Sequence, residues 1–85
     1  MRVTVQFFGR LRELAGRSDW TTDLAAGARA ADAWMAARQA YPALEPFAAA
    51  VSAAVNTDFA PMTTVLADGD AVAFLPPVSG GSTDR

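Results

Sequence analysis

The most informative stretch of this 85-residue chain is Phe74-Leu75-Pro76-Pro77-Val78-Ser79-Gly80-Gly81. The apolar run 71–75 predicts a strand, and the two prolines end it because they cannot donate a ladder hydrogen bond. The glycines have no side chain to pack in a core. We therefore expect a folded domain over residues 1–77 and a flexible C-terminal arm over residues 78–85. An arm ending in two glycines is suited to entering a narrow slot in another protein; the alternative is a frayed terminus.

The beginning of the chain predicts a second clear strand. Val3, Val5 and Phe7 alternate with polar residues and are expected to face the core. Phe8 falls on the polar side of this strand, and Leu75 falls on the outer side of the last one. If the two terminal strands are neighbours, these two side chains form an exposed apolar patch beside the arm, which is typical of a protein-binding site. The alternative is a register shifted by one residue, with both side chains in the core.

Between these strands the hydrophobic periodicity predicts an α+β domain. The expected elements are a short helix over 10–15, a strand over 20–24, the main helix over 28–41, a strand over 51–55 and a turn over 67–70. Gly16 and Pro42 are expected to end the two helices, and Asn56 tolerates the left-handed conformation of a turn. The order of these elements predicts a mixed sheet with helices packed on one face.

The composition argues against several classes of function. The chain has no histidine, and all seven cationic side chains are arginine, so the usual general base and the usual amine nucleophile are both missing. A self-contained enzyme is therefore not expected. The net charge of −2 argues against nucleic-acid binding, which depends on clustered cations. An acidic chain suits a partner with a basic or mixed surface.

Membrane, metal and cofactor sites are not expected either. No apolar run approaches the length of a membrane span, and the first residues enter a strand with no signal-peptide pattern. The chain has no cysteine, which excludes disulfides and thiolate ligands. Asp68 and Asp70 could pair on a metal, but without further oxygen ligands a turn is the favoured interpretation. We expect a cytoplasmic protein that binds no cofactor of its own.

Four blocks of sequence are similar to a known family. They are Val3 to Gly9, Arg12 to Gly16, Ala54 to Asn56, and Leu66 to Gly81. The blocks and their spacing resemble the MoaD-type small subunit of molybdopterin synthase, a family of ubiquitin-like sulfur carriers. The resemblance implies a ubiquitin-like β-grasp fold with an extended C-terminal arm. It also implies two partners, which are the large subunit of the synthase and an E1-like activating enzyme that uses ATP to adenylate the terminal carboxylate.

The resemblance also assigns roles to individual residues. Gly81 would be the adenylation site and would carry the sulfur as a thiocarboxylate, with Gly80 before it; glycines leave a tunnel unobstructed. The sulfur would go to cyclic pyranopterin monophosphate to build the dithiolene of molybdopterin. The partner-binding residues would be Phe8, Phe59 in a loop near the patch, Leu75, Pro76, Pro77, Val78 and Ser79. The diproline would hold the arm extended and so reduce the entropy lost on insertion.

One departure from the family concerns the residues after Gly81. Members of the family end at the second glycine, whereas Ser82-Thr83-Asp84-Arg85 follow here, so Gly81 has no free carboxylate. Either a protease removes residues 82–85, or they are a junction to a further segment, an artificial addition or a mark of an inactive relative. Two other functions stay open: a sulfur carrier for thiazole, cysteine or tRNA thiolation, and a non-catalytic β-grasp interaction module with an inert tail.

Overall fold

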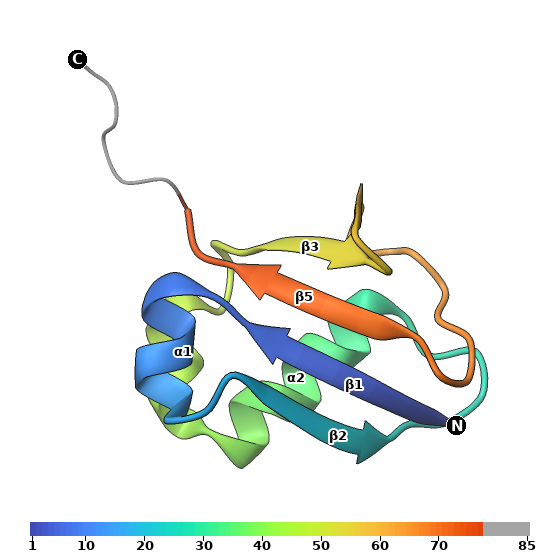
Figure 1. The fold of residues 1–85 in the computed structure, drawn as a ribbon, viewed down its shortest axis with the longest axis horizontal. Helices are drawn as coiled ribbons and strands as arrows, with labels where there is room; N and C mark the ends of the chain where they lie inside the picture. The colour runs from blue at the N-terminus through green and yellow to red at the C-terminus, as the bar shows by residue number, and fades with distance from the viewer. Residues whose placement is uncertain (78–85) are drawn as a thin grey trace.

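The computed structural model describes residues 1–77, and residues 78–85 lie outside this description (Figure 1). The elements are β1 (Arg2–Phe7), α1 (Gly9–Ala15), β2 (Asp19–Asp23), α2 (Ala30–Ala40), the 3₁₀ helix η1 (Pro42–Phe47), β3 (Ser52–Val55), β4 (Asp58–Ala60) and β5 (Ala71–Leu75). The α+β prediction is confirmed. No helix among the described residues is long and apolar enough to cross a membrane.

The two terminal strands lie side by side at the centre of one sheet, whose strand order is β2-β1-β5-β3-β4 (Figure 1). β1 and β5 are parallel, with Phe7 opposite Phe74, and the other pairs are antiparallel. The pairing continues one residue further, because the Phe8 N–H donates to the Phe74 carbonyl at 3.3 Å. The predicted mixed sheet is confirmed, and the adjacency of the first and last strands meets the condition under which Phe8 and Leu75 would be neighbours.

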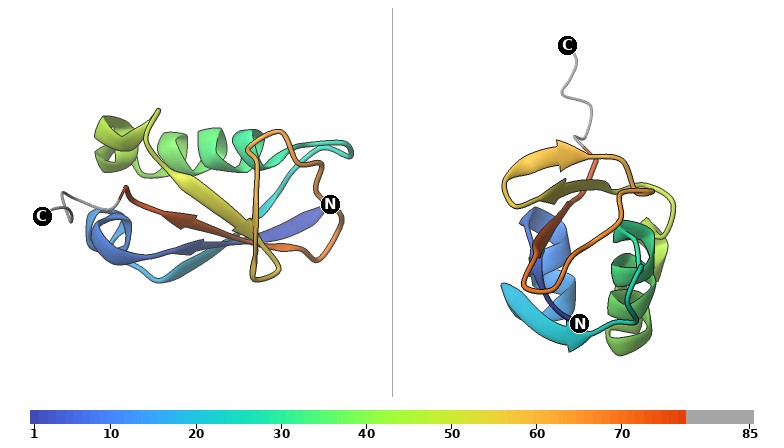
Figure 2. Two further views of the ribbon diagram at one scale, coloured as in Figure 1. Left: turned by 90° about the horizontal axis from the view of Figure 1, so that it is seen from above. Right: turned by 90° about the vertical axis from the view of Figure 1, so that its right-hand side faces the viewer.

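The core lies between the sheet and α2, which covers one face (Figure 2). Val3 and Val5 of β1 and Phe74 of β5 are 0% exposed on that face. Trp34 of α2 packs on Phe74 with ring centroids 4.9 Å apart, and its Nε1 donates to the Ala48 carbonyl at 3.0 Å. Trp34 therefore fills the core while its one polar group stays satisfied. The helix α1 lies at the end of the sheet, where its Leu11 joins the same core.

The main helix begins at Ala30, two residues later than the periodicity predicts. Arg29 precedes it in an extended conformation, and its N–H donates to Asp32 Oδ2 at 2.8 Å. Ala28 is held outside the helix, where its carbonyl accepts from the Leu66 N–H. The carboxylate three residues after the cap is the signal for this start. The end of α1 at Gly16, in the left-handed conformation with φ 76°, agrees with the prediction.

The prediction that Phe59 lies in a loop is wrong. Phe59 belongs to β4, which pairs with β3 through the two-residue turn Asn56-Thr57. Both turn residues have positive φ, 50° and 77°, which matches the twist of a tight hairpin. The strand was missed because three residues are too short to show a period. The turn expected at Asn56 is confirmed.

Candidate partner-docking face and arm root

The helix α2 covers one face of the sheet, and an apolar patch occupies the other face. No helix of the described part of the chain covers this second face (Figure 2). This open-face patch consists of Phe8, Ala54, Phe59, Ala73 and Leu75. Alternation places Phe8, Ala54, Ala73 and Leu75 outward, because each adjoins a buried core residue in the sequence. Phe59 lies on the same face because it is paired with Ala54 across β3 and β4. Phe8 is 47% exposed and Phe59 is 76% exposed, so two large aromatic side chains face solvent and are not packed in the core.

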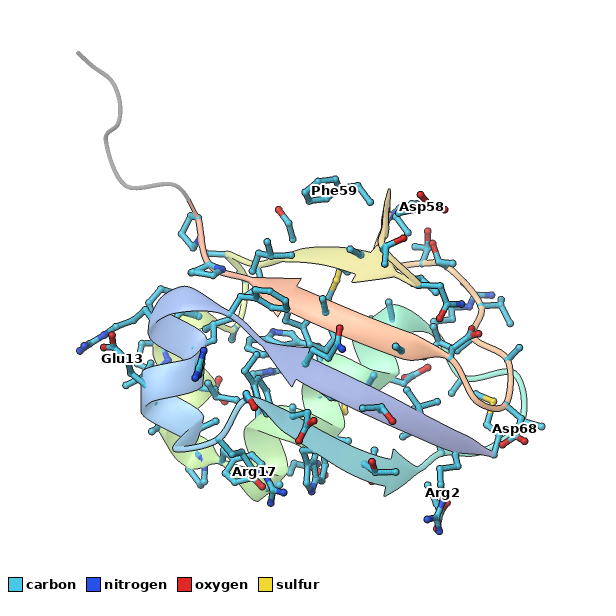
Figure 3. The ribbon with its side chains drawn as sticks, in the orientation of Figure 1. Arg2, Glu13, Arg17, Asp58, Phe59 and Asp68 are labelled. Carbon is cyan, nitrogen blue, oxygen red and sulfur yellow. The ribbon has the colours of Figure 1, made fainter. Side chains whose placement is uncertain are left out.

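Strand register brings the members of the open-face patch together. Ala54 of β3 lies opposite Phe59 on one side and Ala73 on the other, and Ala73 and Leu75 share the outward face of β5. Phe8 extends β1 next to the end of β5. Figure 3 shows Phe59 projecting from the β4 edge of the sheet. The two alanines are nearly buried and their side chains are short. The patch is therefore shallow at the alanines, with the two phenylalanines projecting on either side of them.

The positions of Phe8 and Leu75 agree with one prediction and refine the other. Phe8 is exposed as predicted, and the shifted register is excluded because Phe7 beside it is 2% exposed. Leu75 faces outward but is only partly exposed. The sequence does not predict that Ala54 and Ala73 belong to the patch. The two-residue turn at Asn56-Thr57 is the signal that places Phe59 opposite Ala54. The partner-binding role of this patch stays a prediction.

The arm begins next to this patch, at a close contact between Pro76 and Gly9. Gly9 has φ 54°, and a Cβ built on it would lie 3.2 Å from Pro76 Cγ. Glycine thus allows the first turn of α1 to approach the residue that ends β5. Pro76 is half-buried and Pro77 is exposed. Pro77, the last described residue, therefore follows the central strand β5 at the end of the sheet that carries α1 (Figure 1).

The remaining predicted site residues cannot be placed. Val78, Ser79, Gly80 and Gly81 lie outside the described residues, as does the extension 82–85. The roles assigned to them stay predictions. What the structure does place is the root of the arm, Pro76 and Pro77, and the surface around it.

The carboxylates of the turn at 67–70 bind the chain itself. Asp68 Oδ1 accepts the Arg2 N–H at 2.6 Å. Asp70 accepts the Ala67 N–H at 2.8 Å and the Asn56 side-chain amide at 2.9 Å. These two hydrogen bonds, chiefly the one from the Ala67 backbone, hold the pKa of Asp70 below its ordinary value. Across residues 1–77, no three acidic, histidine or cysteine side chains gather as a metal site would require. The turn is structural.

The five-stranded mixed sheet, with β1 and β5 parallel at its centre and a helix across one face, defines a ubiquitin-like β-grasp protein. Solved structures agree. The small archaeal modifier protein SAMP1 from Haloferax volcanii superposes with a TM-score of 0.85 at 30% identity, covering 95% of this chain and 100% of that one. A chain in the complex of subunits 1 and 2 of the molybdopterin-converting factor from Helicobacter pylori 26695 gives 0.66 at 28% identity, covering 95% and 100%.

Sequence comparison gives the family. The model of the ThiS family matches residues 5–81, which is most of the chain. The molybdopterin synthase sulfur carrier subunit of Mycobacterium tuberculosis is 37% identical over 82 residues, covering 95% of this chain and 99% of that protein. The chain therefore belongs to the ThiS family. The predicted recognition and the predicted β-grasp fold are both confirmed.

Proposed function

We propose that this chain is a sulfur carrier for molybdopterin synthesis and that Gly81 carries the sulfur. The observation that carries this proposal is the open-face patch beside the arm root. A carrier needs a surface for docking and a slender segment that reaches the partner's reaction centre, and here the open-face patch adjoins the end of β5, after which that segment begins. The relative from Mycobacterium tuberculosis, named a molybdopterin synthase sulfur carrier subunit, supports the choice of pathway.

The chemistry at Gly81 requires two steps that a partner performs. In the first, the Gly81 carboxylate attacks the α-phosphate of ATP, which gives an acyl-adenylate and releases pyrophosphate. In the second, sulfide delivered by a donor attacks the acyl carbon, and AMP leaves, so that a thiocarboxylate results. The carrier supplies only the carboxylate and an unobstructed approach, which agrees with its lack of histidine and cysteine.

Two partners follow from this chemistry. The large subunit of molybdopterin synthase would hold the open-face patch and take the arm, and the complex of subunits 1 and 2 from Helicobacter pylori supports such a pair. An E1-like activating enzyme would take the same arm during adenylation. Both partners must recognise the domain by a surface that leaves the arm free, and the open-face patch meets that requirement.

The carboxylate of Gly81 has to be released before it can be activated. The sequence continues with Ser82 after Gly81, so the Gly81 carbonyl belongs to a peptide bond. Asp84 and Arg85 are charged, and moving them into a closed tunnel would be costly without dedicated partners. We therefore propose that a protease cleaves after Gly81 and that the form ending at Gly81 is the active carrier.

The test compares the full chain with the form ending at Gly81, which keeps every described residue. Each form is incubated with the activating enzyme from the same cell, ATP and a sulfur source, and its mass is measured. The form ending at Gly81 should exchange one oxygen for one sulfur, and the full chain should not. Thiolation of the full chain at Arg85 would overturn the cleavage step. If neither form reacts, the carrier function is wrong and a non-catalytic module becomes the better explanation.

A second carrier function shares the same arm chemistry. SAMP1 from Haloferax volcanii superposes more closely than the molybdopterin-converting factor chain, with TM-scores of 0.85 and 0.66, so the fold alone does not select the acceptor. A carrier for thiazole, cysteine or tRNA thiolation would also form the thiocarboxylate. Adding the large synthase subunit and cyclic pyranopterin monophosphate to the thiolated form separates the two, because only the molybdopterin carrier should yield dithiolene product.

A further inference from the structure

Two shallow hollows lie beside the arm root, on the side of the domain that carries α1. The larger one, of about 550 Å³, is lined by Gly9, Arg12, Glu13, Gly16, Arg17 and Ser18. The smaller one, of about 210 Å³, is lined by Gln6, Phe7, Phe8, Gly9, Arg12, Ser18 and Asp19. Gly9, Arg12 and Ser18 line both. Arg12 therefore stands where the surface of α1 meets the open-face patch, next to the glycine that contacts Pro76.

Neither Arg12 nor Arg17 forms an ion pair with a carboxylate of residues 1–77. Glu13 is already engaged by Arg10 at 3.0 Å. Arg17 donates to the Asp19 backbone carbonyl and to the Tyr41 hydroxyl, not to a carboxylate. Over residues 1–77, Arg12 has no hydrogen-bond or ion-pair partner for its guanidinium. Asp19 is the one acidic side chain left near the two arginines, so the local charge is positive although the whole chain is acidic.

The opposite end of the domain has the reverse character. Figure 3 shows Asp58 and Asp68 there, with Arg2, far from Glu13 and Arg17. Arg2 is engaged by Asp23 at 3.5 Å. The described part of the molecule is therefore polarised along the strands. Arg12 and Arg17, which form no ion pair with a carboxylate, lie near the arm root, whereas acidic side chains outnumber arginines at the other end, where Arg29 also has no ion pair. A partner with acidic groups at the mouth of its tunnel would be approached arm first, because opposite charges orient the encounter.

We propose that Arg12 receives a carboxylate side chain of the protein that takes up the arm, and that this contact orients the arm toward the tunnel. The inference rests on the proposed carrier function and adds the chemistry of the partner's surface. A guanidinium whose N–H groups have no other partner binds a carboxylate through two parallel hydrogen bonds. This bidentate contact fixes the relative orientation of the two groups as well as their distance. Because Arg12 adjoins both Phe8 and the Gly9–Pro76 contact, a partner on the open-face patch would reach it.

The experiment measures association of the full chain and of the form ending at Gly81 with the large synthase subunit and with the activating enzyme. Arg12→Ala is compared with Arg2→Ala, which removes the same charge from the far end, and circular dichroism checks that both variants fold. We expect Arg12→Ala to lower the association rate about three- to tenfold at low salt, with the difference vanishing as salt screens the charges. Arg2→Ala should change the rate less than about twofold.

A third variant and the binding of the unaltered protein complete the test. Arg12→Lys keeps the charge but loses the bidentate contact, so it should restore the association rate while dissociation stays faster. If Arg12→Ala behaves as Arg2→Ala with both partners while Phe8→Glu abolishes binding, the proposal for Arg12 is wrong and the carrier function stands. If the unaltered form ending at Gly81 binds neither partner, the carrier function is overturned and this inference with it.

Discussion

The two faces of the sheet are built from the same strands but serve different needs. On the covered face Val3, Val5 and Phe74 are fully buried against Trp34. On the open face Phe8 and Phe59 are exposed, although each is as apolar as the residues of the core. The covered face explains why the chain folds. The open face contributes little to folding, and its exposed aromatic side chains are the ones that the proposed docking of a partner protein would use.

The largest loss of stability is expected from a substitution on the covered face. Trp34→Ala removes the largest fully buried side chain together with the hydrogen bond from its Nε1 to Ala48. It should lower the free energy of unfolding by about 3–5 kcal/mol, a large part of the total for so small a domain. Denaturant titration followed by circular dichroism measures this. Equal stability of the variant would mean that the core is not centred on α2.

Substitutions on the open face should separate binding from folding. Phe8→Glu and Phe59→Glu are expected to leave the unfolding midpoint nearly unchanged and to weaken binding to the large synthase subunit by about 2 kcal/mol or more, as at the centre of an interface. Met35→Glu is the matched control, because Met35 is 49% exposed on α2, away from this face. Loss of folding in either phenylalanine variant would place that residue in the core. Leu75→Glu should weaken binding too, but with some loss of stability, because Leu75 is partly buried.

A smaller effect on stability and on partner binding is expected from a substitution at Gly9, which contacts the arm root. In Gly9→Ala the new Cβ would lie 3.2 Å from Pro76 Cγ, and the residue would have to keep φ 54°. We expect a loss of about 1 kcal/mol in unfolding free energy and weaker partner binding, because Pro76 must move. Gly27→Ala is the control, since Gly27 has φ 86° but nothing within 4 Å of its built Cβ. If the two variants bind the partner equally, the Gly9–Pro76 contact does not position the arm.

The smallest effect concerns the turn at the far end. The pKa of Asp70 is lowered in the folded protein, so its contribution is present above the ordinary carboxylate pKa and is lost as the pH falls below it. Stability should therefore decline on acidification through that range, and Asp70→Asn should flatten this part of the profile. Unfolding midpoints measured across acidic pH values test this. A profile unchanged in Asp70→Asn would assign the decline to other carboxylates.

The sequence predicts the long elements of this fold because their patterns are local. Alternation identifies β1 and β5, and the alanine-rich period with Pro42 after it identifies α2. β4 is too short for any period, and its pairing depends on a turn in which Thr57 takes an unusual positive φ. The start of α2 was misplaced because the Asp32 carboxylate, not the apolar pattern, caps the helix.

The site is predictable to a smaller extent, because it depends on contacts between distant residues. Phe8 could be identified because it interrupts a polar face within one strand. The place of Phe59 over Ala54 depends on the pairing of β3 with β4. The basic character around Arg12 is hidden in the sequence, since the net charge is negative and only the fold separates the two ends. The contact of Gly9 with Pro76 joins opposite ends of the chain and has no local signature.

The place of β5 has a consequence for the order in which the protein can fold. β5 lies between β1 and β3, so Thr4 finds its partner Ala71 only after nearly the whole domain has been synthesised. Such distant pairing raises the contact order and slows folding. The sheet is complete only when the last strand, β5, has paired with β1 and β3, and only then does Pro76 contact Gly9. A partner that binds the arm root and the open face at the same time would therefore bind only chains whose folding is complete.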